Sequence, residues 1–215
     1  MITTTYHSPL GEIVLAADAR GLRGLWFADQ KHFGSTLTGS EVEFDMTRGT
    51  FPQGVIVDDG ESCEEIRGCD AVSGERPMHA GSPKNVAAVA VLERVWAWLN
   101  AYFAGQDPRW TPPLHVEGTD FQHAVWVALL SVPYGETVTY GELARMVGER
   151  MGCTAATAGM QVSPRAVGAA VGRNPISIIV PCHRVVGADG SLTGYAGGIE
   201  RKRYLLELES EGKLA

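Results

Sequence analysis

One segment of the chain, Pro181-Cys182-His183-Arg184, places a thiol, an imidazole and a guanidinium side by side. A cysteine thiolate is a strong nucleophile, and a neighbouring base or cation makes it available near neutral pH. The apolar run Ile176–Val180 just before Pro181 predicts a strand, so Cys182 is expected at a strand end, where the backbone can turn both side chains to one site. A Cys-His pair by itself is more often structural, with the cysteine acting as a small buried hydrophobe.

The elements that must position this segment are predicted as short helices. Thr119 and Gln122, and again Thr139 and Glu142, have the spacing of a capping box that begins a helix. Ser163 is expected to cap a third helix that has proline at its first position and continues through Val171. Asn174-Pro175 ends it, since proline disfavours helical geometry in the residue before it. Two short helices, the second with a face of small residues, fit a helix-turn-helix variant.

The first half of the chain has a different pattern. Residues 1–28 are predicted as strands, and Asn85–Tyr102 as a helix with Gly105 beyond its end. Between them, residues 30–85 are rich in Gly, Ser, Asp, Glu and Pro, apart from a strand-like patch at 54–57. A structureless stretch of this length is unusual in a compact domain, so it is interpreted as an insertion. Residues 107–113 are expected to be a linker.

Composition sets broad limits. The 215-residue chain has a net charge of −7, which argues at first against a nucleic-acid binder. However, residues 31–90 hold five Lys/Arg against ten Asp/Glu, whereas residues 119–206 hold eight against six. Neither a secretion signal nor an apolar run of membrane-spanning length is recognised. The four cysteines do not form a disulfide framework, which favours reduced thiols in the cytoplasm.

Several segments together resemble one family. Ile179-Val180-Pro181-Cys182-His183-Arg184-Val185-Val186 is similar to the active-site signature of the O6-alkylguanine-DNA alkyltransferases, also called methylated-DNA–protein-cysteine methyltransferases. The resemblance covers residues 118–209, and more loosely residues 6–27 and 101–105. Its further segments are Gly118-Thr119-Asp120-Phe121-Gln122, Val125-Trp126, Val132-Pro133-Tyr134-Gly135, Thr139-Tyr140-Gly141-Glu142-Leu143-Ala144, Arg165-Ala166-Val167-Gly168, Asn174-Pro175 and Gly194-Tyr195-Ala196-Gly197-Gly198.

The resemblance implies a catalytic group. Cys182 would accept the alkyl group irreversibly, so one molecule would repair one lesion. His183 would act as base through a water molecule, and Glu209 would orient it, which lowers the cost of forming the thiolate. Asn174 would hold the turn before the active-site strand. Tyr140 would help to rotate the target nucleotide and would donate a proton to the departing guanine.

The resemblance also implies DNA-binding and pocket residues. Arg165 would fill the gap left in the base stack by the flipped nucleotide. Ala166, Gly168 and Ala169, with Tyr140, would approach the minor groove. The pocket residues would be Tyr195, Val171, Gly197, Gly198 and Pro181.

The implied protein is an α+β monomer acting on double-stranded DNA that contains O6-alkylguanine, without a membrane. Residues 1–110 would form a small α/β domain with an antiparallel sheet and the acidic insertion. Residues 114–215 would form a mostly helical domain with a winged-helix DNA-binding motif. No cofactor is implied, because the cysteine itself is consumed.

Two stretches depart from the family pattern: residues 30–85, expected to be dispensable, and residues 149–162, an extra loop between the two DNA-binding helices. Some family members carry a structural zinc near the N-terminus. Cys63, Cys69 and His79 match no zinc spacing, nor does Cys153 suggest a metal, so no metal site is predicted.

Other interpretations stay open. Singly, Arg165 could be a surface cation, Tyr140 a core aromatic, Asn174 a helix terminator and Glu209 a solvated charge. The protein could be a non-reacting sensor of alkylated DNA, although sensors replace the acceptor cysteine. It could be a small-molecule thiol hydrolase or transferase, which would show no salt-sensitive DNA affinity. In a plain winged-helix regulator the Pro-Cys-His-Arg segment would have no purpose.

Overall fold

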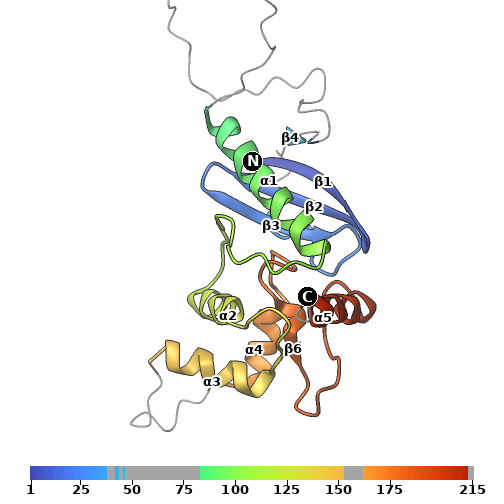
Figure 1. Cartoon of the computed structure of the whole chain (residues 1–215). Coiled ribbons are helices and arrows are strands. Elements are labelled where there is room, and N and C mark those ends of the chain that lie inside the picture. The colour runs from blue at the N-terminus through green and yellow to red at the C-terminus, as the bar shows by residue number, and fades with distance from the viewer. Residues whose placement is uncertain (38–41, 44–45, 47–82, 153–161, 213–215) are drawn as a thin grey trace, which may run out of the picture.

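A computed structural model of the chain describes residues 1–37, 42–43, 46, 83–152 and 162–212. Within them, β1 (Ile2–Ser8), β2 (Gly11–Asp18) and β3 (Gly21–Phe27) form an antiparallel meander. β4 (Val42–Glu43) pairs with β1 in parallel, which gives the order β3-β2-β1-β4 (Figure 1). The strands predicted for residues 1–28 are confirmed.

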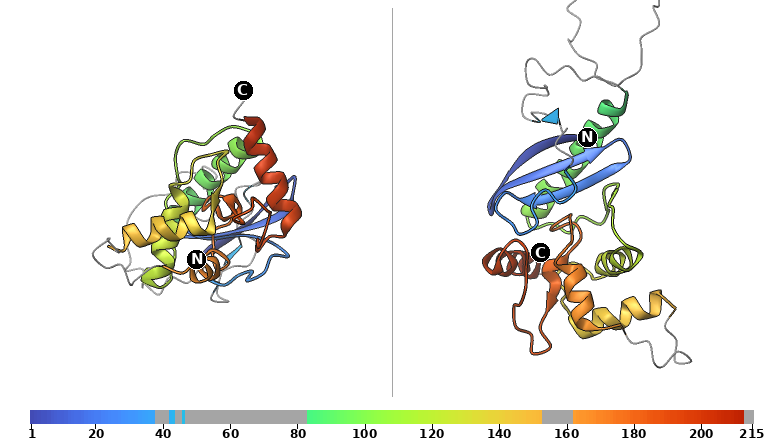
Figure 2. Two further views of the ribbon diagram at one scale, coloured as in Figure 1. Left: turned by 90° about the horizontal axis from the view of Figure 1, so that it is seen from below. Right: turned by 180° about the vertical axis from the view of Figure 1, so that it is seen from behind.

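Helix α1 (Pro83–Phe103) lies across one face of this sheet, as Figures 1 and 2 show from opposite sides. Its apolar side chains recur at helical spacing and are buried at Leu92, Val95, Leu99 and Tyr102. Contrary to the sequence expectation, α1 is long and apolar enough to cross a membrane, by length and composition alone, and it is the one such helix among the described residues. Its packing against the sheet is that of a core helix.

The second half is built from α2 (Asp120–Leu130), α3 (Tyr140–Arg150), α4 (Pro164–Val171) and α5 (Ile199–Gly212). α2, α3 and α4 pack on one another. Both predicted capping boxes are present, with Thr119 and Thr139 each accepting from the backbone N–H three residues on. Ser163 stands at the predicted cap position of α4, but its side chain makes no capping hydrogen bond. The antiparallel sheet of the first half and the helices of the second half confirm the α+β fold class.

The predicted strand Ile176–Val180 is wrong. Its first residue makes a single bridge to Leu25, and the chain then folds into a tight loop. The amide of Asn174 organises that loop by donating to the carbonyls of Ile176 and Val180 and accepting from the Ile176 N–H. Ile178 has a φ of 67°, which a β-branched residue rarely adopts. Side-chain capture of the backbone thus overrides strand propensity.

Cys182 consequently follows a loop and begins a 3-10 turn, η2 (Cys182–Arg184), rather than ending a strand. β6 (Val185–Val186) comes next and pairs in parallel with β5 (Val138–Thr139). This short pair ties the cysteine segment to the start of α3.

The edge strand β3 joins the sheet to the second half of the chain. β3 bonds to the 104–119 connection through Leu22, and to the loop before Cys182 through Leu25 and the Pro175 carbonyl. Pairing along the one edge of β3 that β2 leaves open fixes the cysteine loop against the N-terminal sheet, so the sheet serves as the support of the site.

The acidic stretch is only partly described. Residues 30–37 form turns that pack on the molecule, and residues 83–85 already belong to α1, so the predicted insertion 30–85 is too wide at both ends. The predicted strand at 54–57 lies outside the described residues. In the second predicted insertion, 149–162, α3 extends to Arg150 and residues 153–161 lie outside them.

Candidate active site

The thiol of Cys182 lies at the bottom of a cavity, with only 4% of the residue exposed. Its Sγ accepts a hydrogen bond of 3.1 Å from Asn174 Nδ2, the same amide that organises the preceding loop. One buried side chain therefore sets both the backbone path and the polar environment of the sulfur. Both residues were predicted as site residues.

Two opposing effects act on the Cys182 thiol. Burial raises its pKa, because the thiolate is poorly solvated there, while the Asn174 hydrogen bond and the positive charge of Lys202 lower it. Lys202 is fully buried, and its ammonium donates to the carbonyls of Val185 and Thr193. Burial lowers the pKa of Lys202 to about 8. On balance the resting residue is a thiol that needs a base to react.

Such a base stands next in the sequence. His183 is fully buried, and its Nε2 lies 2.8 Å from Glu209 Oε1. Nδ1 has no hydrogen-bond partner among the described residues. Burial lowers the pKa of His183 despite the nearby carboxylate, which favours a neutral ring. If Nε2 carries the proton toward Glu209, Nδ1 keeps a free lone pair.

Glu209 on α5 is the centre of a buried polar cluster. Beyond His183, it accepts from the guanidinium of Arg184 through both oxygens, from Tyr102 Oη at 2.8 Å and from the Gly135 N–H at 3.0 Å. Burial would raise the pKa of Glu209, but the bonds from His183 and Arg184 outweigh it and lower the pKa to about 2. The carboxylate therefore stays ionised and holds the imidazole in one orientation.

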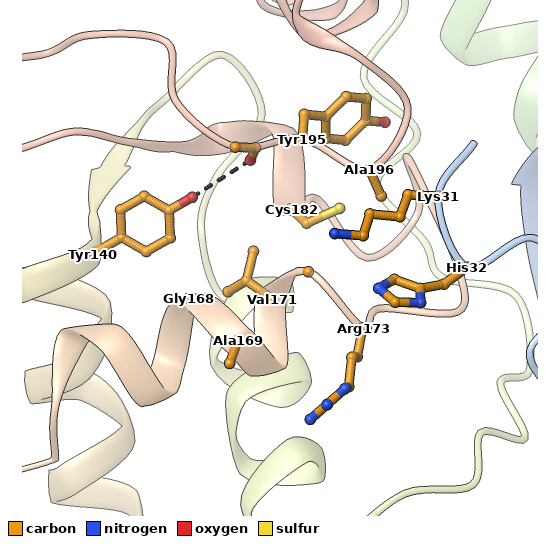
Figure 3. A pocket seen from close by; sticks show the side chains of 12 residues that line it. Lys31, His32, Tyr140, Gly168, Ala169, Val171, Arg173, Cys182, Tyr195 and Ala196 are labelled. Carbon is orange, nitrogen blue, oxygen red and sulfur yellow. Dashed lines mark hydrogen bonds between the residues drawn. The ribbon is translucent and has the colours of Figure 1, made fainter. Parts of the chain in front are cut away.

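The cavity above Cys182 has a volume of about 540 Å³, within the usual range for small-ligand sites. Figure 3 shows Tyr140 on one side of it and Lys31, His32 and Arg173 on the other. The Tyr140 hydroxyl points to the backbone carbonyls of Thr193 and Gly194, at 3.4 and 3.5 Å. The other lining residues are Gly168, Ala169, Val171, Gly172, Cys182, Gly194, Tyr195 and Ala196.

The predicted pocket residues divide into two groups. Tyr195 and Val171 line the cavity, whereas Pro181, Gly197 and Gly198 do not. Gly197 packs behind the wall, where a Cβ would come within 2.7 Å of the Tyr195 ring. Gly198, with a φ of 92°, lies in the turn that leads into α5.

The predicted DNA-binding residues other than Tyr140, which begins α3, lie on α4. Arg165, Ala166 and Ala169 are exposed, while Val167, Ala170 and Val171 are buried against the neighbouring helices. Gly168 is half-buried and faces Tyr140 across the cavity rim. The helix thus presents small side chains and one cation, a surface that lets a second molecule approach its backbone.

Sequence reasoning gave no role to four residues that the structure brings to the site: Tyr102, Arg184, Lys202 and Lys31. Arg184 was noted only as a cation beside the Cys-His pair, and Tyr102 only as part of a family-like helix end. Lys202 and Lys31 carry no local signal, since the burial of Lys202 and the place of Lys31 at the cavity depend on packing between distant segments.

Among the described residues there is no group of three or more His, Cys, Asp or Glu side chains that could hold a metal ion. Cys63, Cys69, His79 and Cys153 lie outside the described residues.

Comparison with known proteins decides the family. Residues 120–211 match the model of the 6-O-methylguanine DNA methyltransferase DNA-binding domain. The chain is 42% identical over 158 residues to the methylated-DNA–protein-cysteine methyltransferase of Haemophilus influenzae, covering 79% of that protein and 72% of this chain. This chain belongs to the methylated-DNA–protein-cysteine methyltransferase family.

Structural likeness to a solved protein of this family extends over nearly the whole chain. A crystal structure of Mycobacterium tuberculosis OGT in complex with DNA matches 99% of this chain and 94% of its own, with 36% identity and a TM-score of 0.63. The match to the Mycobacterium bovis methyltransferase is 58% identical over 111 residues, which is 52% of this chain. That match spans 61% of the length of the relative.

Proposed function

We propose that this protein repairs DNA by transferring the alkyl group of an O6-alkylguanine to Cys182, once per molecule. The observation that carries the proposal is the arrangement at the cavity floor: a thiol bonded to Asn174, with the His183–Glu209 pair behind it. Family membership and the resemblance to a protein solved with DNA support double-stranded DNA as the partner.

The chemistry follows from these contacts. The Cys182 proton passes through a water molecule to Nδ1 of neutral His183, and Glu209 stabilises the resulting imidazolium. The thiolate attacks the carbon attached to O6, so an S–C bond forms as the C–O6 bond breaks. The Tyr140 hydroxyl donates a proton to the departing guanine. The thioether is stable, so the protein is consumed.

Access to the lesion requires that the nucleotide leave the base stack, because Cys182 is buried beneath the cavity. α4 presents Arg165 for the vacated space and Ala166 and Ala169 for close approach to the groove. The protein acts as a monomer in this scheme, in a reducing compartment such as the cytoplasm that keeps the Cys182 thiol free.

Intact-mass spectrometry tests this function. After incubation with duplex DNA containing O6-methylguanine, the mass should rise by one methyl group, mapped to Cys182, and Cys182→Ala should gain nothing. A folded wild-type protein that binds this DNA without any gain in mass would refute alkyl transfer and would favour a sensor.

A small-molecule thiol transferase is the competing activity, and DNA binding separates the two. The repair function requires an affinity for duplex DNA that falls steeply with salt. If the protein fails to bind duplex DNA even at low salt, the repair function is contradicted.

A further inference from the structure

The segment that follows β3 is fastened to the cysteine half of the molecule by three separate contacts. Gln30 is buried and accepts from Ser177 Oγ at 3.0 Å, just before the strained Ile178. The Lys31 N–H donates to the Ala196 carbonyl at 3.0 Å, on the wall of the cavity. Asp29 pairs with Arg201 of α5 at 2.7 Å. These contacts hold the N-terminal segment and the cysteine half of the molecule in a fixed position relative to each other.

These contacts place Lys31 and His32 at the tip of a turn. The turn is closed by a bond of 3.2 Å from the Phe33 N–H to the Gln30 carbonyl, and His32 has a φ of 64°. Both side chains line the cavity, although they come from the N-terminal half of the chain. In Figure 3 they lie with Arg173 on the side of the cavity opposite Tyr140.

Within the described part of the chain, the cationic side chains at this rim are not paired with an acid. Lys31, His32 and Arg173 are exposed, and none forms an ion pair with a described residue. Asp29, the nearest acid in sequence, is engaged by Arg201. No acidic side chain is among the described residues that line the cavity. In a chain with a net charge of −7, two cations at the mouth of one cavity that no described acid neutralises form a site for an anion.

We propose that Lys31 and Arg173, with His32 between them, form a phosphate-binding rim that holds the backbone of the extruded nucleotide. The inference rests on the proposed function. A nucleotide that enters base-first leaves its flanking phosphates at the cavity mouth, where these side chains lie. The rim neutralises the phosphates and keeps the base inserted, so the N-terminal half of the chain takes part in DNA binding through Lys31 and His32.

The test compares Lys31→Gln/Arg173→Gln with Arg109→Gln, which removes one charge from an exposed side chain outside the cavity. Binding to duplex DNA containing O6-methylguanine is measured between 50 and 200 mM salt, in the unreactive Cys182→Ala background. Each lost phosphate contact should make the slope of log K against log salt less negative by about 0.9, so the double variant should shift by nearly 2. Arg109→Gln should leave the slope unchanged.

A second readout uses the reactive proteins. The double variant should transfer more slowly from DNA but at the wild-type rate from O6-benzylguanine, a free base with no phosphate. An unchanged slope of log K against log salt in the double variant would refute the phosphate-binding rim. An equal loss of transfer rate on both substrates would also refute it, because it would indicate a damaged cavity. If the wild-type protein accepts an alkyl group from neither substrate, the proposed function is refuted instead. The slope of log K against log salt is measured by binding alone, so it still tests the phosphate-binding rim.

Discussion

The Asn174 Nδ2, which carries two hydrogens, lies within hydrogen-bond distance of three acceptors: two backbone carbonyls and the sulfur of Cys182. Asn174→Asp keeps the shape but replaces the donor by a negative oxygen, which repels a thiolate. We expect the thiol pKa to rise and alkyl transfer at neutral pH to fall by at least tenfold. Titration of thiolate absorbance in the ultraviolet measures the pKa. An unchanged titration together with a loss of transfer would assign Asn174 to loop structure only.

Glu209 gives a prediction on pH. Its pKa is about 2 in the folded protein, against an ordinary value of 4.5, so the unfolded state takes up the proton first as the pH falls. This contribution to stability is present above pH 4.5 and is lost between pH 4.5 and about 2. A pKa shift of this size corresponds to a contribution of about 3 kcal/mol to the free energy of unfolding.

Chemical denaturation across that pH range measures the effect on the free energy of unfolding. Glu209→Gln should flatten the pH dependence and, at neutral pH, cost about 3–5 kcal/mol, because Arg184 is left as a buried charge without its counterion. Glu207→Gln, on the exposed face of the same helix, is the matched control and should behave like the wild type. Equal acid sensitivity of wild type and Glu209→Gln would contradict the assignment.

At the scale of elements, the helix caps differ in a way that sequence spacing does not reveal. Thr139 makes a complete capping box at the start of α3, whereas Ser163 at the start of α4 makes no capping bond. Thr139→Ala should therefore lower the free energy of unfolding by about 1 kcal/mol, and Ser163→Ala by much less. Urea denaturation of the two variants measures the difference. Equal losses would mean that Ser163 caps α4 in solution.

The same scale explains what could be predicted from sequence. The helices begin where capping boxes indicate, and the β1–β3 meander and α1 follow from local periodicity. The run Ile176–Val180 predicts a strand because strand propensity is local, while the Asn174 bonds and the positive φ of Ile178, which prevent the strand, depend on tertiary context. Cys182 and His183 could be proposed from a motif and Glu209 from the family resemblance, but the burial of Lys202 could not be predicted.

At the scale of the whole molecule, the boundary of the acidic stretch matters. Removing residues 30–85 would also remove Gln30, which bonds to Ser177 beneath the active-site loop, Lys31, which bonds to Ala196, and the first turn of α1. We expect that deletion to destabilise the fold and abolish transfer. Replacing only residues 47–82 by a flexible Gly/Ser linker keeps these contacts and should leave the transfer rate within about twofold, since loop length has a small effect on closure entropy.

Both variants are assayed side by side for thermal unfolding and for methyl transfer from duplex DNA. The comparison separates the part of the stretch that contacts the active-site loops from residues 47–82. Loss of transfer in the 47–82 replacement, with the fold retained, would contradict the dispensability of that part. Full activity in the 30–85 deletion would show instead that the cysteine loop holds its shape without the N-terminal segment. In that case the bonds of Gln30 and Lys31 would follow from the position of the loop rather than determine it.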